Sequence, residues 1–113
     1  MHEFGIMNTV LQEVSAAAGG RAVCTVTLRV GPLSGVVPEA LKFAFESLAP
    51  GGVASGARLV MEETKPAFVC VDCGASYETP VGEYRCPVCG SAIGDLTGGN
   101  EMELVSIEVK DDV

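Results

Sequence analysis

Residues 70–90 read CVDCGASYETPVGEYRCPVCG and contain two C-x-x-C pairs, Cys70 with Cys73 and Cys86 with Cys89, separated by twelve residues. Each pair turns its two sulfurs toward one point, and the glycine after each pair permits a tight turn. Two such turns that face each other predict a tetrahedral site of four thiolates, which is typical of structural Zn²⁺. We therefore expect these four cysteines to hold one zinc ion.

Iron is the alternative metal for these pairs. Facing pairs of this form also occur in rubredoxin-type electron carriers, and tetrahedral thiolate geometry suits either metal. The segment between the pairs offers only Tyr77 and Tyr84 as aromatic cover, and an electron carrier would not need the rest of the chain. These two features favour zinc, whereas the spacing alone leaves iron open. Four protein thiolates leave no open position on the metal, so the site is predicted to be structural.

The pairs lie in an insert, residues 65–98, whose composition differs from that of the flanking segments. It is rich in Cys, Gly and Pro, shows no helical period, and is bracketed by Lys65-Pro66 and Gly98-Gly99. So little apolar content cannot close a core, and a structural Zn²⁺, which contributes on the order of 10 kcal/mol, would order it instead. We predict a zinc-binding domain over residues 65–98 and a second domain formed by residues 1–64 plus 99–113.

The flanking segments first show two helical periods. Residues 7–18 repeat apolar side chains at helical spacing and end at Gly19 and Gly20. Residues 38–48 do the same, with Pro38 at the first helical position, which suits that residue. The stripes expected to be buried are formed by Met7, Val10, Leu11, Val14 and Ala18 in the first helix and by Leu41, Ala44, Phe45 and Leu48 in the second.

Three further segments, residues 22–31, 57–63 and 101–110, alternate with the period of a half-buried strand. The side chains expected to face inward are Cys24, Val26, Leu28 and Val30 in the first, Leu59 and Met61 in the second, and Val105, Ile107 and Val109 in the third. Two helices can cover one face of three strands. The predicted fold class is α+β: an α/β layer of two helices on a three-stranded mixed sheet, with an inserted four-cysteine zinc-knuckle domain of rubredoxin-like, zinc-ribbon type.

Composition narrows the functional classes. The chain has 113 residues, 48% of them hydrophobic, and a formal net charge of −8 with seven Lys and Arg. This balance predicts a soluble protein and disfavours nucleic acid and membranes as partners. No signal peptide is visible, so we expect a cytoplasmic location, where cysteines are metal ligands more often than disulfides. A zinc-ribbon adaptor for nucleic acid is therefore a weaker alternative.

His2 is the only histidine and lies one peptide bond from the amino terminus. The Met1 amine, the deprotonated amide of His2 and its imidazole can chelate one metal, and the amide or carboxylate of Glu3 can complete four-coordination. A nitrogen-rich square plane favours Ni(II) or Cu(II) over Zn(II). Because acid restores the amide proton, such a site releases its metal and suits a transient cargo. The alternative is that an unstructured terminus simply tolerates a histidine without function.

A catalytic set is not evident, and we predict that the protein is not an enzyme. A second histidine is missing, and GGVASGAR at residues 51–58 lacks the Lys-Ser/Thr ending of a phosphate-binding loop. The acidic residues of the predicted strands are most simply solvated surface.

Together these segments resemble the HypA/HybF family of nickel metallochaperones of [NiFe]-hydrogenase maturation. The matching segments are MHEFGI (1–6), RVGPLSGVVPEALKFAFE (29–46), CVDCG (70–74), CPVCG (86–90) and GGNEMELVSIEV (98–109). The MHE start combined with a late four-cysteine insert and the G-N-E-M-x-L ending is specific, whereas a zinc knuckle alone is not.

The resemblance implies that His2, with Met1 and Glu3, binds Ni(II) as a transient cargo, and that the four cysteines hold structural Zn(II). It also implies delivery of nickel with the GTPase HypB to the hydrogenase large subunit, by a monomer or weak homodimer. Some relatives carry histidines beside their zinc cysteines. This chain has none there, so an acid-sensing role of the zinc site is not implied.

Overall fold

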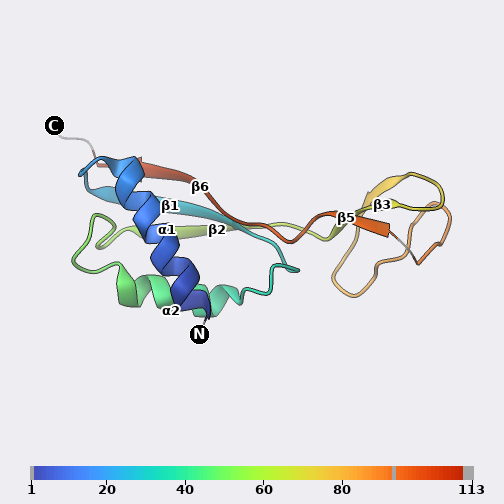
Figure 1. Ribbon diagram of the computed structural model, residues 1–113, viewed down its shortest axis with the longest axis horizontal. Helices are drawn as coiled ribbons and strands as arrows, with labels where there is room; N and C mark the ends of the chain where they lie inside the picture. Colours follow the sequence, from blue (N-terminus) through green and yellow to red (C-terminus); the bar gives the residue numbers. More distant parts are fainter. Residues whose placement is uncertain (1, 93, 111–113) are drawn as a thin grey trace.

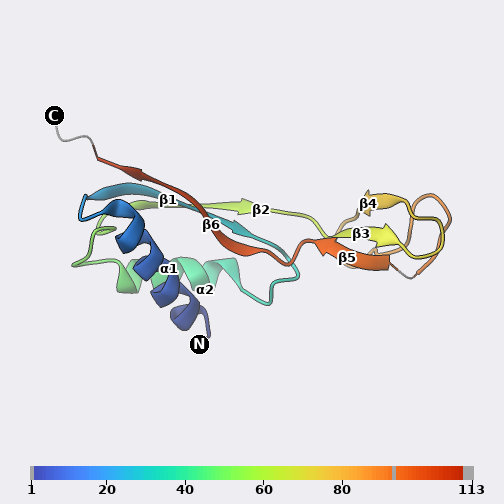
Figure 2. The same cartoon turned by 45° about the horizontal axis from the view of Figure 1, so that its top comes forward.

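The computed structural model describes residues 2–92 and 94–110 (Figure 1). The molecule is elongated, with extents of 56 × 31 × 17 Å, and its two sheets lie toward opposite ends of the long axis (Figures 1 and 2). The elements in chain order are α1 (His2–Ala18), β1 (Val23–Val30), α2 (Pro38–Leu48), β2 (Arg58–Glu63), β3 (Ala67–Cys70), β4 (Ser76–Glu78), β5 (Gly94–Gly98) and β6 (Met102–Val109). No helix within these ranges is long and apolar enough to cross a membrane.

The first sheet has the strand order β2-β1-β6. Its central strand β1 pairs in parallel with β2, so that Val26 lies opposite Leu59, and antiparallel with β6, so that Val26 also lies opposite Ile107. Two parallel neighbours need a crossover, and α2 provides it between β1 and β2. The predicted α+β layer of two helices on a three-stranded mixed sheet is confirmed.

Both helices cover one face of this sheet (Figure 2). The fully or largely buried side chains between the layers are Met7, Val10, Val14 and Ala18 of α1, Leu41, Ala44 and Phe45 of α2, and Val26, Leu28 and Val30 of β1. Leu48, expected in the buried stripe of α2, is exposed, and Ala49 is buried in its place. The opposite face is polar, with the Arg29 guanidinium 3.2 Å from Glu62 and 3.3 Å from Glu103.

Bulges change which side chains of β1 and β6 face the helices. The β1–β6 register shifts twice along the pair. In β1, Val23 is fully buried and Cys24 is only half-buried, so the prediction that Cys24 faces inward was wrong. In β6, Leu104 and Ile107 pack against the core while Val105 is exposed, so the inward assignment of Val105 was also wrong. An extra residue in one strand reverses the alternation beyond it, which a strict period of two cannot foresee.

The second sheet, with the order β4-β3-β5 and antiparallel pairing throughout, lies within the insert. The sequence did not predict these strands, because they are four, three and five residues long and too short to show a period. Their core is small: Cys70, Tyr77 and Cys86 are buried, and Phe68 stacks on Tyr77 with ring centroids 5.6 Å apart.

Two chain segments join the sheets: residues 64–66 between β2 and β3, and residues 99–101 between β5 and β6. The loop after β1 is hydrogen-bonded to the second of these segments. The Leu33 N–H donates to the Gly99 carbonyl at 2.6 Å, and the Gly31 N–H donates to the Glu101 carbonyl at 2.7 Å. The Glu101 carboxylate accepts the Thr64 hydroxyl at 2.7 Å and the Gly99 N–H at 2.9 Å. One carboxylate therefore fastens both connecting segments to each other.

Gly31→Ala should destabilise the protein, because a Cβ at Gly31 would overlap the backbone carbonyl of Gly99, which cannot move aside. We expect a loss of about 1–3 kcal/mol. Gly5→Ala is the matched control: a Cβ there meets no atom within 4 Å, and the helix should gain up to about 1 kcal/mol. Urea denaturation of the metal-loaded protein measures both changes. Equal effects of the two substitutions would contradict the close backbone contact.

Thr64→Val should raise the pKa of Glu101. The hydroxyl of Thr64 is the main cause that lowers this pKa below its ordinary value of 4.5, followed by hydrogen bonds from backbone N–H groups. A lowered folded-state pKa contributes stability above the ordinary pKa and loses it as pH falls through the folded-state pKa. The variant should therefore lose about 0.5–1.5 kcal/mol of stability near pH 7. This loss should become smaller at acid pH, below the folded-state pKa of Glu101. NMR titration of the Glu101 side chain in both proteins tests the shift.

Candidate metal sites

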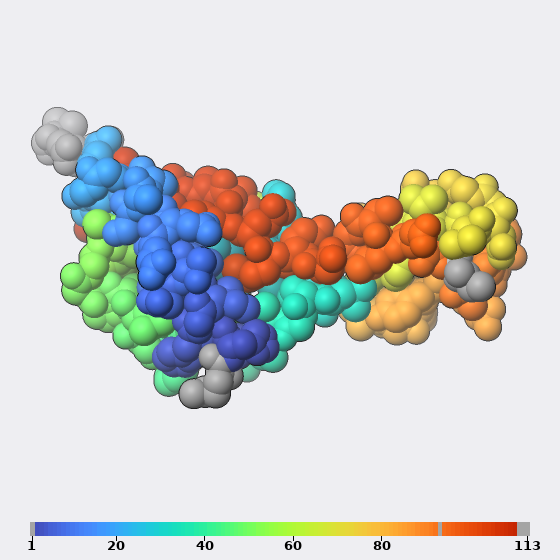
Figure 3. Space-filling model, viewed as in Figure 1, coloured from blue at the N-terminus to red at the C-terminus, as the bar shows by residue number. Residues whose placement is uncertain are grey.

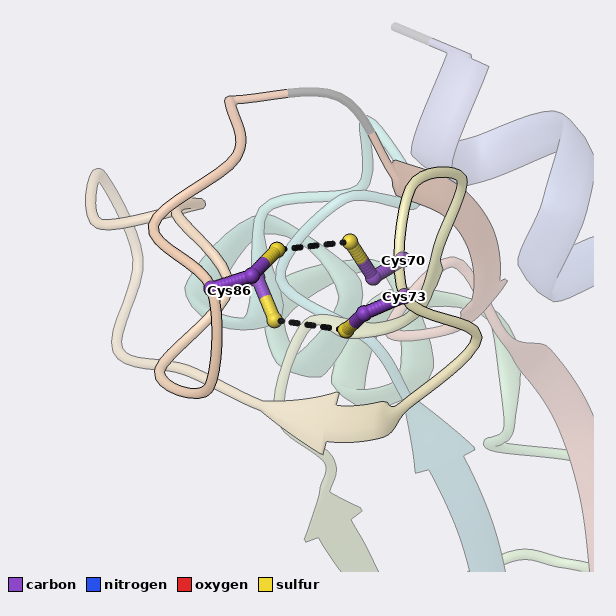
Figure 4. A group of neighbouring side chains, drawn as sticks. Cys70, Cys73 and Cys86 are labelled. Carbon is purple, nitrogen blue, oxygen red and sulfur yellow. Dashed lines mark hydrogen bonds between the residues drawn. The ribbon is translucent and has the colours of Figure 1, made fainter.

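The sulfur atoms of the four cysteines converge on one point, and Figure 4 shows Cys70, Cys73 and Cys86 pointing toward one another. All four Sγ atoms lie within 4.8 Å of one another, with 3.5 Å between Cys70 and Cys89 and 3.6 Å between Cys73 and Cys86. A metal–sulfur bond of about 2.3 Å in a tetrahedron requires sulfurs about 3.8 Å apart. The cluster is therefore a metal-binding site of the closed, four-thiolate kind.

Both cysteine pairs use the same backbone turn. The Gly74 N–H donates to the Cys70 carbonyl at 3.0 Å, and the Gly90 N–H donates to the Cys86 carbonyl at 2.9 Å. Both glycines have positive φ, 75° and 76°, a conformation that L side chains rarely adopt. The glycine after each pair is thus required by the turn, as the sequence pattern predicts.

Backbone N–H groups stabilise the thiolate form of the first sulfur in each pair. The N–H of Cys73 is the main cause that lowers the pKa of Cys70 to about 7, and the N–H of Cys89 likewise lowers the pKa of Cys86. At Cys89 the lowering effect of the Ser91 N–H is outweighed by the hydrogen-bonded Cys70 sulfur and by burial, so that its pKa is raised to about 12. The pKa values of Cys70 and Cys86 are thus lowered and those of Cys73 and Cys89 raised, and a metal ion bound here would displace the remaining thiol protons.

His2 and Glu3 form the second candidate site, in the first turn of α1. The His2 side chain is 60% exposed, and its Nε2 lies 3.5 Å from the Glu3 carboxylate, whose side chain is only 8% exposed. The same carboxylate accepts the Val37 N–H at 3.4 Å. The hydrogen bond from the Glu3 backbone N–H is the main cause that lowers the pKa of Glu3, with the Val37 N–H and the His2 charge adding to it. Met1 lies outside the described residues.

This geometry assigns different parts to the two side chains. Because Nε2 faces Glu3, the Nδ1 of His2 is left for a metal, and it is the nitrogen that forms a six-membered ring with the residue's own amide. The amide of His2 is among the first four of the helix, which have no intrahelical acceptor. The Glu3 carboxylate is turned inward and engaged. The contact between Glu3 and Val37 was not predicted from the sequence. A signal was present, because Val37 precedes Pro38 and has no side chain that could cap α2.

The chain as a whole is similar to proteins of one family. The sequence model of the family described as "Hydrogenase/urease nickel incorporation, metallochaperone, hypA" matches residues 1–109. A hydrogenase maturation factor HypA of Picosynechococcus sp. is 39% identical over 112 residues, which cover 96% of this chain and 99% of the relative. Another, from Geobacter metallireducens, is 39% identical over 112 residues and covers 97% and 100%.

Two solved structures share the fold. A solution structure described as HypA protein superposes with a TM-score of 0.69 at 25% sequence identity and covers 97% of both chains. The solution structure of the Ni metallochaperone HypA from Helicobacter pylori gives a TM-score of 0.65 at 21% identity, covering 95% of this chain and 96% of that chain. The arrangement of helices and sheets therefore recurs in both.

Cys73→Ser should unfold the insert and spare the helix-covered sheet. The insert has a core of three buried side chains, whereas the first sheet has a core of its own. Loss of one thiolate should remove the metal and most of the folding energy that it supplies. Cys24→Ser is the matched control, because Cys24 lies outside the cluster. Amide NMR spectra and metal content measure the outcome; a dispersed spectrum for residues 67–98 in metal-free Cys73→Ser would contradict the prediction.

Proposed function

Because this chain belongs to the HypA family of hydrogenase/urease nickel-incorporation metallochaperones, we propose that it binds Ni(II) at its amino terminus and delivers it for the maturation of a [NiFe]-hydrogenase. The proposed nickel ligands are the Met1 amine, the amide and the imidazole Nδ1 of His2, and the amide of Glu3. The observation that carries the proposal is the exposed His2 imidazole, whose second nitrogen faces a buried carboxylate.

A carboxylate behind a metal-binding histidine fixes the ring and its tautomer. Protein histidines that bind metals usually donate their other N–H to such a group. In this chain the Glu3 carboxylate has that position, and it is itself held by the Val37 N–H. We therefore assign Glu3 a supporting role through its carboxylate and a ligand role through its amide alone.

We propose that Cys70, Cys73, Cys86 and Cys89 hold structural Zn(II), which would order residues 65–98 as a zinc-binding domain beside a nickel-binding domain of residues 1–64 plus 99–113. The convergence of the four sulfurs and the absence of an open coordination position support this role. The alternative is an iron site of an electron carrier. A red, iron-containing purified protein would favour the alternative, and a colourless zinc-loaded one would exclude it.

Delivery of nickel requires partner proteins. We propose the GTPase HypB and the hydrogenase large subunit, and expect neither nucleic acid nor a membrane to be a partner. We further propose that the protein acts in the cytoplasm as a monomer or weak homodimer and catalyses no reaction. The net charge of −8 is consistent with partners that are not polyanions.

Calorimetric titration with Ni(II) tests the proposed site. Zinc-loaded, tag-free protein should bind nickel, and binding should be lost in His2→Ala and in a protein with one glycine added before Met1, because each change removes or displaces a ligand. Thermal melts should show His2→Ala within about 0.5 kcal/mol of the unsubstituted protein, since an exposed side chain has little packing to lose. Equal nickel affinity in all three proteins would refute the amino-terminal site.

A further inference from the structure

Direct transfer of nickel from His2 to another protein proceeds by ligand exchange with an acceptor. The acceptor must bring its own ligand atoms within a coordination-bond length of the ion, which is about 2 Å for a nitrogen ligand. A specific interface covers about 800 Å² on each partner. The surface that surrounds His2 must therefore be covered by the acceptor during transfer. This reasoning rests on the proposed function.

Two exposed apolar side chains lie in that surface. Val37, the residue before α2, is 55% exposed, and Phe43, in the middle of α2, is 61% exposed. Val37 contacts Glu3 through its N–H, and the Phe43 ring packs edge-to-face against Phe4 with centroids 5.9 Å apart. Since Glu3 and Phe4 directly follow His2 in the chain, both side chains flank the nickel end. Figure 3 shows the dark-blue start of α1 beside the cyan segment that leads into α2.

A cavity lies next to these side chains. Val36 and Pro38, on either side of Val37, line a cavity of about 400 Å³ between the two sheets. Its other wall comes from the insert, where Pro80 and the exposed Val81 contribute. The lining is mainly apolar and the volume exceeds that of one side chain, so the cavity suits an apolar side chain of a bound protein together with part of the segment that carries it. An anchor of this kind is the usual centre of a stable interface.

Charge argues against a second copy of this chain as the occupant. Each copy carries a net charge of −8; Glu39 lies in the first turn of α2, and the cavity wall has one acidic group, Glu63, and one basic group, Lys65. Like-charged surfaces repel, whereas an acceptor with a basic rim would be steered to this face. The occupant is thus a different protein.

We propose that Val37 and Phe43, together with the cavity lined by Val36 and Pro38, form the docking surface for the protein that accepts nickel from His2. The acceptor would present an apolar side chain to the cavity, basic groups around it, and its metal ligands toward the exposed imidazole.

The test compares nickel binding with acceptor binding in a double variant, Phe43→Gln with Val81→Ser, which changes one exposed side chain of α2 and one of the cavity wall. Gln is a good helix former and Val81 is 63% exposed, so the protein should remain folded. The control is Val105→Thr, which changes an exposed apolar residue of β6 outside the core. The acceptor probe is the nickel-free precursor of a [NiFe]-hydrogenase large subunit from the same organism. Calorimetry measures nickel affinity of each protein alone, and a binding titration measures affinity of the nickel-loaded proteins for the precursor.

We expect the double variant to bind nickel within about twofold of the unsubstituted protein and to bind the precursor at least about tenfold more weakly, with the control unchanged in both. Equal precursor binding by double variant and unsubstituted protein would overturn the docking surface, as would equal weakening in Val105→Thr. Failure of the unsubstituted, nickel-binding protein to bind the precursor would overturn the proposed acceptor. Absence of nickel binding in the unsubstituted protein is a different result, which refutes the proposed function itself.

Discussion

The convergence of four cysteine sulfurs on one point is the constraint on which the insert depends. Its sulfurs lie within 4.8 Å of one another, where four thiolates without a cation would repel. Backbone N–H groups offset part of that repulsion, as the lowered pKa of Cys70 records. The remaining apolar contacts are few, since three side chains make up the buried core of this sheet. The proposed zinc ion would therefore order the insert more than hydrophobic burial does.

The amino terminus is organised by a different principle. The backbone N–H groups of its first helical turn have no intrahelical carbonyl acceptor. A metal ion bound to these nitrogens would therefore break no helical hydrogen bond. The His2 ring is exposed, while the carboxylate behind it is buried and hydrogen-bonded to the start of α2. This arrangement contradicts the view of His2 as a residue in an unstructured terminus. A site at a helix end can be rigid on its protein side and open on its solvent side, which suits a cargo that must be released.

Sequence patterns were sufficient where one side chain's position follows from its neighbours along the chain. The spacing of the cysteines predicted their convergence, and the helical periods predicted the buried faces of α1 and α2 apart from the exposed Leu48 and the half-buried Leu11. They failed where a position depends on another segment. The bulges that turn Cys24 and Val105 outward arise from strand pairing, and the Glu3–Val37 hydrogen bond joins residues 34 positions apart. The short strands of the insert were missed because three to five residues are too few to show a period.

The loop between β1 and α2 is hydrogen-bonded both to the segment that leads back from the insert and to the first turn of α1. Its Leu33 N–H binds the Gly99 carbonyl in a segment that leads back from the insert, and its last residue, Val37, binds the carboxylate beside His2. The absence of a Cβ at Gly31 permits the close approach of these backbones. The same loop contributes Val36 to the cavity between the sheets. A protein docked over this loop would therefore contact the first turn of α1 and the insert together, so the proposed docking surface includes part of the insert.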